Sequence, residues 1–143
     1  MKQLFSIICV LCFARNFLLH AEENSVLNKD GEKYVHAHPD LSDAKRKAIE
    51  AGQVLKGMCP NEAIAAAGIP YFYEAQLDKK WSSNTDPQFV IEKQCEAPDK
   101  SKITLYFENK TQFGNKSKFK VIFQSGQITD ISSLQTTNSP SSR

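Results

Sequence analysis

Histidine and cysteine are scarce in this sequence. The 143 residues include three histidines and four cysteines, and only His36, His38, Cys59 and Cys95 follow Ala21. His36 and His38 alone do not make a specific metal site, because zinc sites need further nearby ligands. The sequence also has no phosphate-binding glycine loop, no metalloprotease helix motif and no pair of carboxylates at a catalytic spacing. These absences favour a non-catalytic protein that holds no metal and no cofactor.

The sequence also lacks a hydrophobic run long enough to span a membrane. The apolar run Leu4–Ala14 has eleven residues, whereas a membrane-spanning helix needs about 20. A short apolar run behind a positive residue, here Lys2, is typical of a signal peptide, and small residues fit cleavage after Ala14 or Ala21. We therefore expect residues 1–21 to be a signal peptide and the protein to be periplasmic or secreted. The alternative is an apolar anchor that is retained.

An excess of charge of one sign is missing as well. The formal net charge is +2, from 18 basic and 16 acidic residues. Residues 1–21 contain Lys2 and Arg15 and no acidic residue, so cleavage after Ala21 leaves 16 basic residues against 16 acidic ones. A neutral chain has no electrostatic reason to bind nucleic acid or anionic lipid headgroups. We expect no nucleic-acid partner, and no membrane anchor after signal cleavage.

Two cysteines, Cys59 and Cys95, remain after the expected cleavage. An even number of cysteines in an oxidising compartment favours one disulfide. Closing the loop between Cys59 and Cys95 with a disulfide would stabilise the protein by about 4 kcal/mol, less any strain in the folded state. The alternative is two unpaired thiols, of which Cys59 would be the more reactive, because a helix N-terminus favours the thiolate form.

The hydrophobic pattern changes from helical to alternating along the chain. Residues 22–39 are polar, without an apolar period, and predict a flexible lead-in. Apolar residues at helical spacing then predict two short helices, Leu41–Ala51 and Pro60–Ala67. From Gln88 onward the alternation predicts antiparallel strands. We expect these strands at Phe89–Cys95, Lys102–Asn109, Lys118–Phe123 and Ile128–Ile131.

This order of elements predicts an α+β domain over residues 40–132. In this architecture, two short N-terminal helices pack on one face of a three- to four-stranded antiparallel sheet. The opposite face, which includes Tyr106, is then free to contact water. Residues 133–143 are rich in serine, threonine and asparagine and predict a disordered tail.

The second predicted helix has clear signals at both ends. Pro60 suits a first helical position, and Gly68 followed by Pro70 suits a C-terminal stop. Cys59 and Glu62 have the spacing of a capping box, with cysteine where serine or threonine is usual. Because a thiol is a weak hydrogen-bond acceptor, cysteine at this position indicates another use for the sulfur, and a disulfide is the simplest one.

The segment around this helix resembles a known family. It reads Leu55-x-Gly57-Met58-x-x-x-Glu62-x-Ile64-x-x-x-Gly68-x-Pro70. This pattern is similar to that of the small outer-membrane assembly lipoproteins called SmpA, OmlA or BamE, over about residues 41–132. The resemblance implies a three-stranded antiparallel sheet after the motif and a protein partner in the cell envelope. It also implies that the motif residues Gly57, Met58, Glu62, Gly68 and Pro70 are mainly structural.

The chain departs from this family in two respects. Family members that act in barrel assembly carry an acylated cysteine, whereas the bulky residues Ile8 and Leu11 precede Cys9 and Cys12 here. We therefore expect no lipid attachment. The segment Tyr71–Pro87 is also longer and more aromatic than the resemblance implies.

Aromatic residues form the candidate protein-binding group. Tyr71, Phe72, Tyr73 and Trp81 lie close together in the sequence, and Tyr106 falls on the outward face of a predicted strand. Exposed aromatic residues are typical of binding surfaces. Their alternative role is to pack the second helix onto the sheet.

Three functional hypotheses follow. The first is an exported, non-catalytic protein-binding or scaffold domain of the bacterial cell envelope, linked to outer-membrane assembly. The second is a secreted or periplasmic inhibitor that binds an enzyme through its sheet face and aromatic loop. The third is an enzyme or metal protein, which would need His36, His38 and Cys59 to converge. We expect the first.

Overall fold

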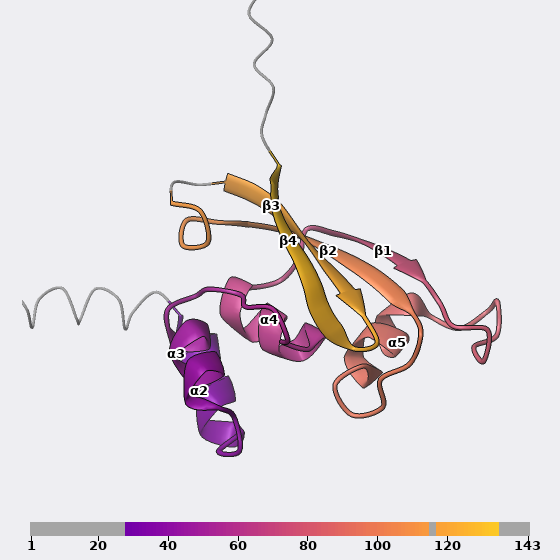
Figure 1. Cartoon of the computed structure of the whole chain (residues 1–143), viewed down its shortest axis with the longest axis horizontal. Helices are drawn as coiled ribbons and strands as arrows, with labels where there is room; N and C mark the ends of the chain where they lie inside the picture. Colours follow the sequence, from indigo (N-terminus) through magenta and orange to yellow (C-terminus); the bar gives the residue numbers. More distant parts are fainter. Residues whose placement is uncertain (1–27, 115–116, 135–143) are drawn as a thin grey trace, which may run out of the picture.

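The computed structural model describes residues 28–114 and 117–134. Its elements in chain order are α2 (Lys29–Ala37), α3 (Asp43–Glu50), α4 (Pro60–Ala67), β1 (Phe72–Gln76), α5 (Pro87–Lys93), β2 (Lys102–Asn109), β3 (Ser117–Gln124) and β4 (Gln127–Leu134). The four strands form one antiparallel sheet in the order β1-β2-β3-β4 (Figure 1). The prediction of an α+β domain with an antiparallel sheet is confirmed. The predicted signal peptide, 1–21, lies outside the described residues. Of the tail predicted for residues 133–143, Ser133 and Leu134 instead end β4, and the rest lies outside the described residues.

Two helices form close to their predicted positions. α4 has the predicted bounds, with Pro60 in its first turn and Gly68 at its C-terminal cap. α3 starts directly after Ser42, whose hydroxyl oxygen accepts a hydrogen bond from the amide of Lys45 at 3.4 Å. Both helix starts are recognisable in the sequence, because proline and short polar side chains suit the unpaired first-turn amides.

α2 forms where the sequence predicts a flexible lead-in. The side-chain oxygen of Asn28 caps it by accepting a hydrogen bond from the amide of Gly31 at 3.0 Å. Val35 is buried in the core, and Tyr34 packs against the core from the same helix. The lead-in prediction is wrong here because α2 owes its position to contacts with α3 and α4, which a weak apolar pattern does not reveal.

α5 replaces the predicted strand Phe89–Cys95. Asp86 caps this helix by accepting a hydrogen bond from the amide of Gln88 at 3.0 Å, and Pro87 occupies the first turn. A short apolar run such as Phe89–Ile91 is compatible with a strand or a buried helix. The strand prediction is wrong because the aspartate and proline in front of the run are helix-start signals.

The sequence does not predict β1, which follows α4 directly. Four of its five residues are exposed, so it lacks the buried alternation by which a strand is recognised. It pairs with β2 from Phe72↔Tyr106 to Gln76↔Lys102. β2 has the predicted bounds, while β3 and β4 extend beyond the predicted strands.

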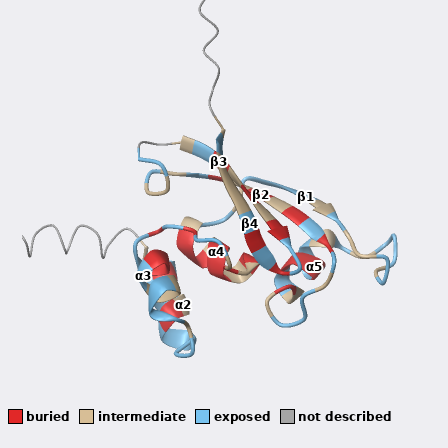
Figure 2. Cartoon of the chain, viewed as in Figure 1, coloured by how far each residue is buried: buried red, intermediate tan, exposed pale blue. Residues whose placement is uncertain are grey.

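One face of the sheet carries most of the core. Its buried residues are Ile103, Leu105, Phe107, Phe119, Val121, Phe123 and Ile128. They form one cluster with Ile49, Met58 and Ala63 from the helical side of the molecule. Figure 2 shows buried segments on the strands and on the helices that face them. The alternation of β2 and β3 between buried and more exposed residues produces this one-sided core.

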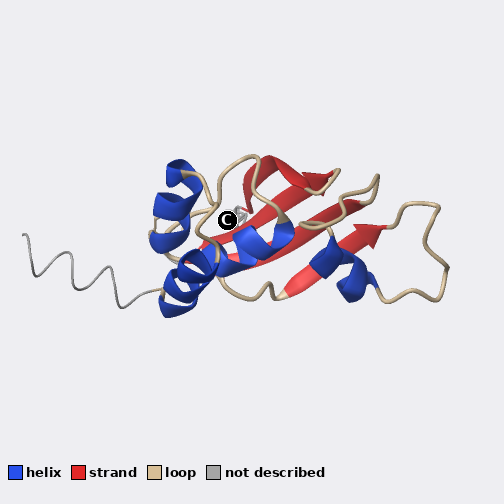
Figure 3. Cartoon of the chain, turned by 90° about the horizontal axis from the view of Figure 1, so that it is seen from below, coloured by secondary structure: helices blue, strands red, loops and turns tan. Residues whose placement is uncertain are grey.

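The helices all lie to one side of the sheet (Figures 1 and 3). α4 contacts β2, whereas α2 and α3 contact each other and α4. The helical layer therefore contains four helices in the described chain, in place of the two expected. The face that they leave open is the one on which Tyr106, one of the candidate binding residues, lies.

Candidate protein-binding surface

Three aromatic side chains gather on the open side of the sheet. Phe72 of β1 and Tyr106 of β2 are register partners, and their ring centroids lie 5.4 Å apart. The ring of Tyr71, just before β1, lies 6.3 Å from that of Tyr106. We call Tyr71, Phe72 and Tyr106 the β1–β2 aromatic surface. Its position follows from the pleat of β2, because Leu105 and Phe107 point into the core and Tyr106 between them points away from it.

This surface is largely uncovered. Tyr71 and Phe72 are 52% and 53% exposed, and Ile69, two residues before Tyr71, is 90% exposed. Single exposed apolar residues are ordinary, whereas a contiguous group on one face is characteristic of an interaction site. The group also contains tyrosines, which contact a partner through the ring and the hydroxyl.

Charged groups of both signs border the aromatic rings. The hydroxyl of Tyr106 donates a hydrogen bond to Oε2 of Glu74 at 3.2 Å. Desolvation, followed by this bond and the charge of Glu74, raises the pKa of Tyr106 above its ordinary value. The Nζ of Lys118 lies 5.3 Å from the ring centroid of Tyr71, a cation–π contact. An apolar centre with a charged rim is the common composition of a protein interface.

Tyr73 lies on the other side of β1. Its register partner is the buried Leu105, whereas the partner of Phe72 is the outward-facing Tyr106. Tyr73 is nevertheless 39% exposed, because β1 is at the edge of the sheet. The candidate residues 71–73 therefore occupy both faces of one edge strand.

Trp81 is separate from the β1–β2 aromatic surface. Its Nε1 donates a hydrogen bond of 2.6 Å to Oδ2 of Asp99, and Nζ of Lys80 lies 3.1 Å from the same oxygen. Its ring packs edge-on against Phe89 of α5 at 6.1 Å. Trp81 thus fastens its loop to α5 and to the start of β2, which the sequence could not indicate, since Asp99 is 18 residues away.

Asp99 is the polar centre of this loop. Its side chain is only 4% exposed. Burial opposes its charge, but hydrogen bonds from Ser101, Trp81 and Lys80 outweigh burial and hold the pKa of Asp99 well below its ordinary range. The neighbouring Asp78 accepts hydrogen bonds from the amides of Lys80 and Lys100, which lower its pKa as well. The network keeps both carboxylates charged.

The motif residues have structural positions. Gly57 and Gly68 have φ of 88° and 93°, which favour glycine. The fully buried Met58 accepts a hydrogen bond from the amide of Ile128 through its carbonyl at 2.8 Å, and the amide of Gly57 donates to the carbonyl of Ile128 at 3.1 Å. The motif thereby attaches the chain before α4 to the start of β4. Pro70 precedes β1 and is half-buried.

Glu62 joins the start of α4 to α3. Its Oε2 accepts a hydrogen bond from the amide of Cys59 at 3.0 Å, which is the carboxylate half of the predicted capping box. The same oxygen lies 2.8 Å from Nζ of Lys45. The spacing of Cys59 and Glu62 predicts the first of these contacts, whereas the second depends on how α3 and α4 pack against each other.

The predicted disulfide is present. Cys59 and Cys95 are bonded, across a sequence separation of 36 residues. The bond joins the start of α4 to the chain just after α5, and Sγ of Cys95 accepts a hydrogen bond from the amide of Asn61 at 3.4 Å. A cysteine is a weak helix cap, and its presence at this position predicted another use for the sulfur. The disulfide is that use.

The two histidines take no part in a metal cluster. His38 stacks on Tyr34 at 4.0 Å, and its Nδ1 lies 2.8 Å from the carbonyl oxygen of Tyr34. His36 is exposed in the last turn of α2. Within residues 28–114 and 117–134, no three histidine, cysteine, aspartate or glutamate side chains are grouped to hold a metal ion.

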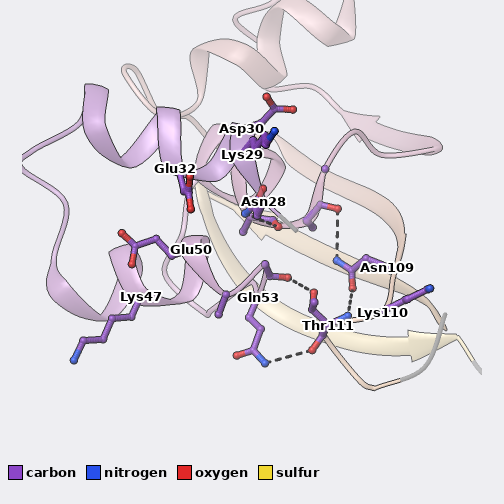
Figure 4. A pocket seen from close by; sticks show the side chains of 15 residues that line it. Asn28, Lys29, Asp30, Glu32, Lys47, Glu50, Gln53, Asn109, Lys110 and Thr111 are labelled. Carbon is purple, nitrogen blue, oxygen red and sulfur yellow. Dashed lines mark hydrogen bonds between the residues drawn. The ribbon is translucent and has the colours of Figure 1, made fainter. Parts of the chain in front are cut away.

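An open groove of about 1120 Å³, which the sequence did not indicate, lies where three helices meet. Figure 4 shows Asn28 at its inner end and Lys47 and Lys110 at its rim. The amide nitrogen of Asn28 donates hydrogen bonds to the carbonyls of Ile49 and, at 3.2 Å, Ala65. Three lysines and three carboxylates line the groove: Lys29, Lys47, Lys110, Asp30, Glu32 and Glu50. This mixed lining selects no single class of ligand.

Comparison with family models, curated proteins and solved structures finds no match to the chain. Among the helices that the structure describes, none has the length and apolar character needed to cross a membrane.

Proposed function

We propose that this protein is an exported, non-catalytic protein-binding or scaffold domain of the bacterial cell envelope, linked to outer-membrane assembly. The observation that carries the proposal is the β1–β2 aromatic surface, where the exposed rings of Tyr71 and Phe72 and the partly exposed ring of Tyr106 lie beside Glu74 and Lys118. Exposed aromatic side chains bordered by charges supply contact area, hydrogen bonds and orientation to a protein partner.

The envelope location is supported by the N-terminal sequence and by the disulfide. A short apolar run after Lys2 is typical of an export signal. The bond between Cys59 and Cys95 is compatible with an oxidising compartment, where such bonds persist. The link to outer-membrane assembly rests on the resemblance of the Leu55–Pro70 segment to the BamE-like family.

The inhibitor alternative has less support. It calls for an aromatic loop that inserts into the cleft of an enzyme. The one tryptophan of the chain, Trp81, is instead hydrogen-bonded to Asp99 and packed on Phe89. A ring held in this way would have to leave its partners before it could enter a cleft.

Site-specific photocrosslinking in living cells tests the proposal. A photoreactive phenylalanine replaces Phe72 in one variant and Phe89 in a matched control, since the two rings are 53% and 47% exposed. We expect the Phe72 position to crosslink to one envelope protein of the barrel-assembly machinery, and the Phe89 position to give no such product. Equal crosslinking from both positions, or none from Phe72, would contradict the proposal, and a crosslink to a soluble hydrolase would favour the inhibitor alternative.

A further inference from the structure

The two edges of the sheet differ in how they are protected. Along β4, the chain before α4 forms hydrogen bonds to Ile128 through Gly57 and Met58. β4 also has an irregular register opposite Ile122 and Phe123, and such a bulge interrupts further pairing. Along β1, no strand other than β2 is paired in the part of the chain that the structure describes. Figure 1 shows β1 as the outer strand on the side away from β4.

The sequence of β1 also leaves this edge open. Natural edge strands are blocked by lysine, by proline, by a bulge or by a covering element. The strand Phe72–Gln76 reads FYEAQ and has neither lysine nor proline, although Pro70 stands just before it. Alternate backbone N–H and C=O groups of an edge strand point away from its neighbour and can bind another strand.

We propose that β1 binds an extended segment of the partner protein as an additional strand, so that recognition combines backbone pairing with the β1–β2 aromatic surface. This inference rests on the proposed function and specifies how the partner binds. Addition of a strand to a sheet edge is a known mode of peptide recognition, in which main-chain hydrogen bonds give affinity and alternate side chains give specificity.

The side chains of β1 define the sequence that this partner segment should have. Phe72 and Glu74 point to the open face, and Tyr73 points to the helical face. A partner strand would place apolar or aromatic residues beside Phe72 and Tyr73, one on each face. It would place a basic residue beside Glu74, because opposite charges directly across a strand pair stabilise it.

The same charge argues against a second copy of this chain. Symmetric antiparallel pairing of two β1 strands about their centre would set Glu74 opposite its own equivalent, since it is the third of the five residues. Like charges directly opposite each other destabilise a strand pair. The edge is therefore better suited to a different protein than to self-association.

The test begins with a library of random ten-residue peptides selected on the mature, disulfide-bonded protein. The tightest peptide is then synthesised unmodified and in two N-methylated forms, one methylated at odd positions and one at even positions. A bound strand directs alternate N–H groups toward its neighbour. We therefore expect one methylated form to bind about tenfold more weakly or worse and the other to bind nearly as well as the unmodified peptide.

Two further readouts locate the bound peptide. We expect amide chemical shifts to change along β1, and Glu74→Lys to weaken binding while Glu50→Lys, an equal charge change on α3, leaves it unchanged. Failure of the library to yield a binder, equal loss for both methylated peptides, or shifts confined to other strands would overturn strand addition. The photocrosslink from Phe72 is independent of backbone pairing, so it would still report on the proposed function.

Discussion

Two groups of aromatic side chains lie close in the sequence but differ in their surroundings. The rings of Tyr71 and Phe72 are half exposed and lie against the ring of Tyr106, with Lys118 over the ring of Tyr71. Around Trp81, the indole N–H is bonded to a buried carboxylate and the ring packs on Phe89. The difference teaches that a buried polar partner such as Asp99 turns an aromatic residue into a structural anchor, whereas a polar partner at the surface, such as Glu74, leaves the ring available for binding.

Loss of the disulfide, which lies on the Trp81 side of this comparison, should have the largest effect on the free energy of unfolding. Cys95 follows α5, whose Phe89 packs against Trp81. Replacing Cys59 and Cys95 together with serine should lower the free energy of unfolding by about 3–4 kcal/mol, because the unfolded chain regains its freedom. Urea unfolding, followed by the fluorescence of the single tryptophan and by circular dichroism, measures this loss. A change below about 1 kcal/mol would show that the bond constrains little.

Truncation of the anchor itself comes next. Trp81→Ala removes a ring contact with Phe89 and the hydrogen bond to Asp99, and leaves that carboxylate short of one donor. We expect a loss of about 2 kcal/mol in the free energy of unfolding. Phe72→Ala is the matched control, with an expected change within about 0.5 kcal/mol. Equal losses for the two variants would remove the distinction between anchor and binding surface.

Asp99 should stabilise the folded protein only at pH values at which its side chain is ionised. Its folded-state pKa lies below its ordinary value, so its stabilising effect is complete above about pH 4 and is lost as the pH falls toward the folded-state pKa. Asp99→Asn should therefore destabilise the protein by about 1–2 kcal/mol at neutral pH. The difference from the native protein should shrink between about pH 4 and pH 2. Unfolding curves across this range measure it, and a difference that does not depend on pH would contradict the ionised network.

The smallest effect on stability should accompany the largest effect on binding. Phe72→Ser on the β1–β2 aromatic surface should leave the free energy of unfolding within about 0.5 kcal/mol of the native value. It should nevertheless abolish co-purification of the envelope partner identified by crosslinking. Phe89→Ser, a matched change on α5, should retain that partner. Loss of the partner in both variants would indicate a general defect in folding.

The sequence predicts elements well where local chemistry decides them. The bounds of α4 follow from Pro60 and Gly68, and those of β2 from strict alternation. α5 escapes prediction because its apolar residues are contiguous, so that only the cap at Asp86 distinguishes helix from strand. β1 escapes prediction because an edge strand buries too little to alternate.

The candidate site follows the same division. The outward position of Tyr106 is predictable from the alternation of β2, and the presence of the disulfide is predictable from the even number of cysteines. The separation of Trp81 from Tyr71 and Phe72 is not predictable, since it depends on Asp99, which joins the loop only in the folded chain. The position of Tyr73 is not predictable either. It lies on the opposite face of the sheet from Phe72 because this segment forms a strand and not the predicted loop.

The disulfide also fixes how the chain responds to being cut. β1, the Trp81 loop and α5 all lie between Cys59 and Cys95 in the sequence, inside one covalent ring. A protease that cuts the exposed stretch 82–84 opens this ring without releasing either fragment. The nicked molecule would keep its mass, apart from one added water, until a reductant separates the pieces. A proposed binding edge carried on such a ring would stay attached to the domain even after the loop beside it has been cleaved.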